Sequence, residues 1–130
     1  MSWDNRDADF SELLGETLVE ISGLEVGSED VRFKTASGKQ YVMHHYDECC
    51  ETVSVEDISG EAGDLIGSPL VQAEEASSGE NPPGVTPKYQ DSFTWTFYKL
   101  GTAKGFVTIR WYGESNGYYS EDVDFEEVTE

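Results

Sequence analysis

The sequence predicts a mainly β protein with minor helical content: an antiparallel bent sheet or sandwich of about seven or eight strands with one or two short helices. Short segments alternate apolar and polar residues, which is typical of half-buried strands. Turns rich in glycine, proline and asparagine separate these segments. Hydrophobic residues make up 37% of the chain, which is enough for a core at a length of 130 residues. We therefore expect residues 1–130 to form a single domain.

The N-terminal part predicts a short helix and a first strand. Residues 1–9 are polar and acidic, and we expect them to be frayed and flexible. Residues 10–14 predict a helical turn with Asp9 as its N-cap. Residues 16–26 predict a strand with a bulge or kink at Gly23.

The next segments predict a hairpin and a further strand. Residues 31–35 and 40–46 flank a short turn and predict the two strands of the hairpin. Residues 49–58 alternate again and place Val53 and Val55 on one face. We expect this strand to pair with a strand of the hairpin.

The middle of the chain alternates between structure and breaks. Residues 60–66 predict one helical turn or a loop, and residues 69–76 predict another strand. Residues 77–90 contain three of the four prolines, so we expect a surface loop there.

The C-terminal part has the clearest strand pattern. Residues 91–100 and 105–112 predict a hairpin, and Asn116 with Gly117 predicts a turn into a third strand over 118–128. We expect these strands to form a three-stranded meander. The inner face of its last strand would carry Tyr119, Val123 and Phe125.

The charge of the chain restricts its partners. Acidic residues number 27 and basic residues eight, for a net charge of −19. This charge opposes direct binding to nucleic acid and to anionic membranes, so the expected partners are cations or basic proteins. No apolar run is long enough to span a bilayer, and the first residues lack the features of a signal peptide. The only cysteines, Cys49 and Cys50, are adjacent and cannot join distant elements. We expect a cytoplasmic protein.

Two segments carry a resemblance to a known family: residues 44–70, HHYDECCETVSVEDISGEAGDLIGSPL, and residues 92–124, SFTWTFYKLGTAKGFVTIRWYGESNGYYSEDVD. The chain resembles a family of small uncharacterised phage and prophage proteins with the pattern H-x-x-D-C-C-E-x-V-x-I-E-D-I-x-G. Glu48 stands where that pattern has aspartate. The resemblance implies a phage or mobile-element origin and an intracellular setting, in the host cytoplasm if a phage encodes the protein, and it implies no activity. The matching positions in the first segment are His45, Cys49, Cys50, Glu51, Glu56, Asp57, Gly60, Asp64, Leu65, Gly67 and Pro69.

Histidines and cysteines gather within the first of these segments. Imidazole and thiolate are ligands that zinc favours, so His45, Cys49, Cys50 and Glu51 are candidate metal ligands, with Zn²⁺ as the candidate ion. Strand alternation separates His44 from His45 and Cys49 from Cys50. A site would therefore combine one histidine, one cysteine and a carboxylate such as Asp47 or Glu51. The competing interpretation is a buried cysteine with histidines near the surface.

The same residues offer a possible thiolate–imidazole pair in Cys50 and His45. Acidic neighbours would raise the cysteine pKa and weaken such a nucleophile. The sequence contains no nucleophile elbow, phosphate-binding loop, zinc-protease motif or dinucleotide fingerprint. We therefore favour a protein that is not an enzyme.

Carboxylates are dense near the C-terminus, and we single out five as a partner-binding surface: Glu121, Asp122, Asp124, Glu126 and Glu127. Alternate residues of a strand lie about 6.6 Å apart on one face, so a series of carboxylates can imitate nucleic acid phosphates. The sequence thus predicts an acidic interaction protein that could inhibit a basic host protein of defence or nucleic acid metabolism. A simple solvated acidic surface is the plainer interpretation. The alternative function is a metal- or small-ligand-binding protein, possibly an enzyme, that uses residues 44–51.

Overall fold

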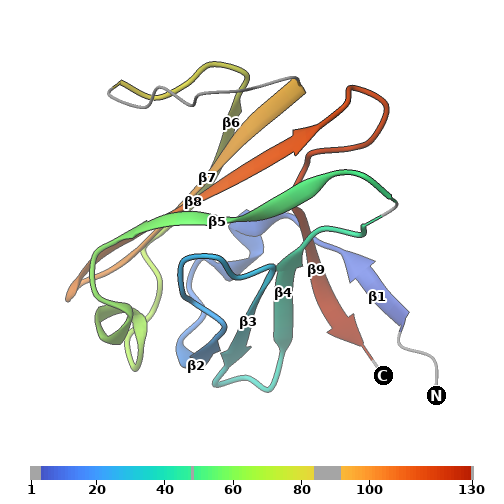
Figure 1. Cartoon of the computed structure of the whole chain (residues 1–130). Helices are drawn as coiled ribbons and strands as arrows, with labels where there is room; N and C mark the ends of the chain where they lie inside the picture. The colour runs from blue at the N-terminus through green and yellow to red at the C-terminus, as the bar shows by residue number, and fades with distance from the viewer. Residues whose placement is uncertain (1–3, 48, 84–91, 130) are drawn as a thin grey trace.

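The computed structural model describes residues 4–47, 49–83 and 92–129, and within them it confirms the predicted fold class. Nine strands form two antiparallel sheets (Figure 1). The five-stranded first sheet has the order β1 (Asp4–Asp7), β9 (Asp124–Thr129), β4 (Gln40–His44), β3 (Asp30–Thr35) and β2 (Leu18–Ser22). The four-stranded second sheet has the order β5 (Thr52–Ser59), β8 (Gly105–Ser115), β7 (Ser92–Thr102) and β6 (Gln72–Ser78). Two short 3₁₀ helices, η1 (Phe10–Leu13) and η2 (Ala62–Leu65), complete the described elements.

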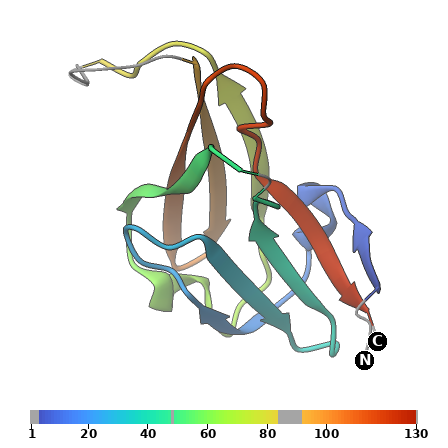
Figure 2. The same cartoon turned by 45° about the vertical axis from the view of Figure 1, so that its right-hand side comes forward.

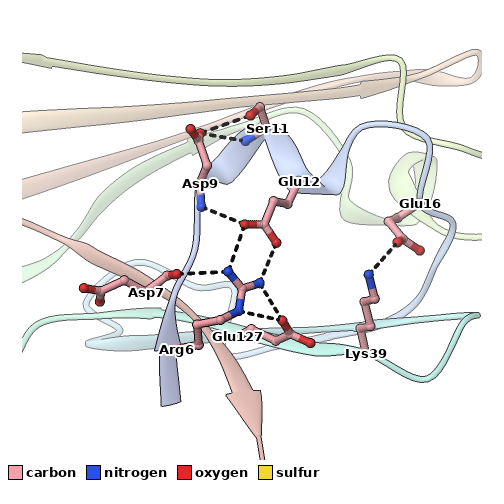
Figure 3. A network of polar contacts seen from close by, with 8 residues as sticks. All are labelled: Arg6, Asp7, Asp9, Ser11, Glu12, Glu16, Lys39 and Glu127. Atoms are coloured by element: carbon pink, nitrogen blue, oxygen red, sulfur yellow. Dashed lines mark hydrogen bonds and ion pairs between the residues drawn. The ribbon is translucent and has the colours of Figure 1, made fainter.

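Part of the N-terminal segment that we expected to be frayed and flexible forms a strand. Residues 4–7 form β1, which pairs antiparallel with β9, while residues 1–3 lie outside the described part. Arg6 stabilises this edge because its guanidinium contacts Glu127 on β9 at 2.6 Å and Glu12 on η1 at 2.7 Å (Figure 3). One cation therefore ties three elements together in a chain that has few cations.

Helix η1 begins as the sequence predicts. The Asp9 carboxylate accepts a hydrogen bond from the Ser11 N–H, and the Glu12 carboxylate accepts one from the Asp9 N–H at 3.2 Å (Figure 3). This reciprocal capping box satisfies amides that a helix start leaves free. It also directs Phe10 and Leu13 into the core.

The β3–β4 hairpin is confirmed, but two expectations nearby are wrong. Strand β2 ends before Gly23 and does not continue through a kink. Gly23 has a φ of +78°, and the Cβ of any other residue there would lie 2.2 Å from the Asp30 carbonyl oxygen. Strand β5 buries Val53 and Val55 as expected, but it pairs with β8 of the second sheet and not with the hairpin. The two valines thus enter the core from the second sheet and not from the sheet that contains the hairpin.

The β7–β8 hairpin is also confirmed, whereas the C-terminal meander is wrong. Strand β8 already has β5 on one edge and β7 on the other, so no edge is left for a third strand. Strand β9 joins the first sheet between β1 and β4 instead, as Figure 2 shows. Val123 and Phe125 are buried as expected, and Tyr119 is half-buried.

The predicted loop over residues 77–90 begins two residues later than expected, because β6 extends to Ser78. Residues 84–90 of that prediction lie outside the described residues. Within the described part of the chain, no helix is long and apolar enough to cross a membrane.

Phe125 packs between the first sheet and η1 in the core. Its ring stacks on that of Tyr41, with the ring centres 5.3 Å apart, and meets the ring of Phe10 edge-on, with the ring centres 5.1 Å apart. These contacts join β9, β4 and η1 around one apolar centre, and Phe10 in turn contacts Tyr98 of the second sheet at 4.7 Å.

We expect Phe125→Ala to lower the free energy of unfolding by about 3–5 kcal/mol, because it leaves a cavity between aromatic rings. Tyr118→Ala is the matched control, since Tyr118 is 88% exposed and its loss should change stability by less than about 0.5 kcal/mol. Urea unfolding monitored by tryptophan fluorescence measures both. Equal effects of the two substitutions would contradict this description of the core.

Candidate functional site

Two adjacent histidines, His44 at the end of β4 and His45 directly after it, point to opposite faces, as strand alternation predicts. The Nε2 atom of His44 lies 2.7 Å from an Oε1 atom of Glu126 on β9. The Nε2 atom of His45 lies 2.9 Å from the Oε2 atom of Glu51, just before β5. The two imidazoles therefore belong to separate polar clusters.

His45 is held at both ring nitrogens. Its Nδ1 atom lies 2.8 Å from the backbone carbonyl oxygen of Asp122, and a carbonyl can only accept, so Nδ1 carries a hydrogen. The side chains of His45 and Glu51 are only 3% and 0% exposed. Burial by itself lowers the pKa of His45, but the hydrogen bonds to Glu51 and Asp122 and the charges of Glu51 and Asp47 outweigh it. The net result is a raised pKa, which favours the imidazolium.

Asp47 completes what we call the His45 cluster: His45, Asp47 and Glu51. One ligand atom from each lies within 4.8 Å of the other two. The Oε1 atom of Glu51 accepts a hydrogen bond from the backbone N–H of Cys49 at 2.9 Å, which turns Oε2 toward His45. The cluster therefore presents one imidazole and two carboxylates.

The predicted metal ligands separate into two groups. His45 and Glu51 meet, whereas Cys49 and Cys50 are exposed and form a disulfide with each other. A bond between neighbouring residues closes no loop and does not cross-link the sheets. In this structure the two sulfur atoms are not part of the His45 cluster.

The five C-terminal carboxylates do not form one exposed series. Glu121 and Glu126 are buried, Asp124 is half-buried, Glu127 pairs with Arg6, and Asp122 is exposed. Glu121 accepts hydrogen bonds from the hydroxyls of Ser115 and Thr94. Sequence alone missed this because a dense charge pattern resembles a solvated surface.

Glu126 shows how such a carboxylate is stabilised. Its Oε1 atom contacts the Nε2 atom of His44 and accepts from the hydroxyl of Tyr46, both at 2.7 Å, and from the amide of Asn5 at 3.1 Å. Burial raises the pKa of Glu126, but these hydrogen bonds outweigh burial and the net pKa is lowered. The opposite holds for Asp124, where burial and the nearby charge of Glu126 raise the pKa.

A cleft of about 460 Å³ lies between η1 and β6, and its described lining contains no basic residue. We call it the η1–β6 cleft. Three of its lining residues are acidic: Asp9, Glu74 and Glu75. The hydroxyl of Tyr98 donates to Glu75 at 3.2 Å. Burial raises the pKa of Glu75, and despite the Tyr98 hydrogen bond the charges of Asp9 and Asp122 keep it raised.

The η1–β6 cleft could not be predicted from spacing. Asp9 and Glu75 are 66 positions apart in the sequence and line one cleft only because of the fold. The Glu74–Glu75 pair is visible in the sequence, but such pairs usually mark solvated strand ends.

A comparison with protein families gives one match: residues 11–125 fit a domain of unknown function, DUF7448. This range includes the histidine and cysteine segment, η2 and all strands of the second sheet. Neither a curated protein nor a solved structure matches the chain significantly.

Replacing the Glu126 carboxylate should alter the pH dependence of stability. A carboxylate with a lowered folded pKa stabilises the fold fully above its unfolded pKa of about 4.3, and this contribution disappears as pH falls through the lower folded value. At neutral pH we expect Glu126→Gln to lower the free energy of unfolding by about 1–3 kcal/mol. The difference from the unmodified protein should begin to shrink below about pH 4.3 and should be smallest once the pH is below the lowered folded pKa, where Glu126 is protonated and neutral like glutamine. Urea titrations at several pH values measure the free energy of unfolding of both proteins. A difference that does not change with pH would contradict the lowered pKa of Glu126.

Proposed function

The chain belongs to the DUF7448 family, a domain of unknown function, and we propose that it is an interaction protein that uses its acidic surface to bind a basic protein partner. The observation that carries the proposal is the η1–β6 cleft, which gathers carboxylates without a basic lining residue among those described. The binding surface is thus centred on the cleft and not on β9.

The ion pairs of the protein support this location. Among the described residues, the arginines at positions 6, 32 and 110 and the lysines at positions 34 and 39 pair with carboxylates outside the cleft. None of the described ion pairs includes Asp9, Glu75 or Asp122. Because carboxylates without a cation repel one another, a positive group from a partner would lower the energy of this region.

The shape of the cleft suits a lysine or arginine side chain. Phe10 and Ala73 supply apolar lining, against which the methylene groups of a basic side chain can pack. Asp9 and Glu75 supply carboxylates for its charged end. An arginine would gain most, because its planar group donates two parallel hydrogen bonds to one carboxylate.

We propose that the partner is a nucleic-acid-binding protein of a host cell, engaged in the host cytoplasm. Such proteins have basic grooves that bind phosphates, and the net charge of −19 suits them electrostatically. The resemblance of residues 44–70 and 92–124 to phage and prophage proteins supports a host partner. Because Glu121 and Glu126 are buried, imitation of phosphates would depend on exposed carboxylates such as Asp122 and Glu74.

The test compares two double variants that remove the same charge. Asp9→Asn with Glu75→Gln changes the cleft while retaining a side-chain oxygen for the η1 cap and for Tyr98. Glu25→Gln with Glu29→Gln is the control, because both residues are exposed in the loop after β2. We expect the cleft variant to bind a basic protein purified from host lysate at least about ten-fold more weakly, and the control to bind nearly normally.

Binding by the unmodified protein should also weaken as salt rises, and nucleic acid should compete with it for the partner. Calorimetry of the purified pair at two salt concentrations measures both effects. Binding that survives molar salt, or equal losses in the two double variants, would refute the cleft as the binding surface.

A further inference from the structure

We propose that the His45 cluster, formed by His45, Asp47 and Glu51, is a binding site for a divalent transition-metal ion such as Zn²⁺. This inference is independent of the basic partner and of the η1–β6 cleft. It rests on the orientation of the imidazole, on the orientation of a buried carboxylate, and on the position of a third ligand group at the surface.

The imidazole of His45 is oriented as metal-binding histidines usually are. Such a histidine donates its remote N–H to a carbonyl or carboxylate, which fixes the ring and leaves the other nitrogen for the metal. Here Nδ1–H donates to the Asp122 carbonyl oxygen, 2.8 Å from Nδ1, so Nε2 is the remaining ligand atom, and it now contacts Glu51 at 2.9 Å. The holding group comes from the segment before β9, far from His45 in sequence.

The carboxylate of Glu51 is fixed in a similar way. The backbone N–H of Cys49 holds its Oε1 atom, and Oε2 points at Nε2 of His45 from 2.9 Å. Two tetrahedral zinc ligands lie about 3.3 Å apart, so a small opening of this contact would admit the ion. Zinc would replace the proton that the imidazole and the carboxylate now share, and this proton would be released to solvent.

Asp47 supplies the third ligand atom from an exposed position. Its side chain can move toward the ion without disturbing the core, so only the small opening of the His45–Glu51 contact affects buried residues. Three protein ligands, of which Asp47 lies at the surface, leave the fourth zinc position open to water. One imidazole with two carboxylates favours Zn²⁺, Mn²⁺ or Fe²⁺, since Ca²⁺ and Mg²⁺ prefer oxygen alone and Cu⁺ prefers sulfur.

The cysteines offer a competing ligand set. Cys49 and Cys50 directly precede Glu51, and in reduced form their thiolates would also bind zinc. The structure instead joins them to each other, so the proposed ligand set contains no sulfur. Replacing both cysteines therefore distinguishes the two ligand sets.

The experiment titrates Zn²⁺ into chelator-treated, dialysed protein at neutral pH and moderate salt, by calorimetry with metal analysis of the product. We expect about one zinc ion per chain, abolished in His45→Asn and in Glu51→Gln. Asp47→Asn should bind at least about ten-fold more weakly, and because Asp47 is exposed this variant should remain folded. Asp57→Asn is the matched control, since it removes the same charge from an exposed residue outside the cluster.

The double variant Cys49→Ser with Cys50→Ser should bind zinc normally, and circular dichroism should confirm the fold of each variant. Loss of zinc in this double variant would overturn the ligand set in favour of a thiolate site. Equal weakening by Asp47→Asn and Asp57→Asn would show diffuse attraction to the acidic surface. Protein that takes up no zinc would also overturn the proposal.

Discussion

The chain must fold with 27 acidic residues and only eight lysines and arginines, so most carboxylates cannot be neutralised by an internal cation. The structure meets this constraint with neutral or partly charged donors. Glu121 receives hydroxyl hydrogen bonds from Ser115 and Thr94, and Glu126 contacts an imidazole, a phenol and an amide. A buried carboxylate is costly unless it is hydrogen-bonded, so these contacts are a condition of the fold. Glu126 lies on β9 and contacts Asn5 on β1, His44 on β4 and Tyr46 just after β4. These contacts therefore also hold β9 between β1 and β4.

Both functional proposals concern places where carboxylates outnumber the positive groups beside them. Asp9, Glu74 and Glu75 line the η1–β6 cleft, whose described lining contains no basic residue. Lys99 lies opposite Glu74 on the neighbouring strand β7, outside that lining. Asp47 and Glu51 share one histidine. A basic side chain in the first place, or a metal ion in the second, would supply positive charge that the chain itself lacks. The two sites are separate, so either can exist without the other.

Local alternation predicted most strands, their approximate limits and the opposite orientations of His44 and His45. It did not predict which sheet each strand joins, because pairing partners are set by contacts distant in sequence. Thus β5 pairs with β8 and not, as alternation alone suggested, with the hairpin. Strand β9 cannot complete the predicted meander because β5 and β7 already occupy both edges of β8. At the candidate sites, Glu51 was predicted, whereas the role of the Asp122 carbonyl was not. A charge pattern in sequence also cannot distinguish a buried, hydrogen-bonded carboxylate such as Glu121 from an exposed one.

In the first of two sets of carboxylates, hydrogen bonds outweigh burial and lower the pKa; in the second, burial and neighbouring negative charges outweigh the hydrogen bond and raise it. Carboxyl pKa values measured residue by residue, by carbon NMR during a pH titration, test this claim most directly. The account predicts that Glu121 and Glu126 titrate below the ordinary glutamate value of 4.5, and that Glu75 titrates above it. If all three titrated together near their ordinary value, the separation of the two sets would be contradicted.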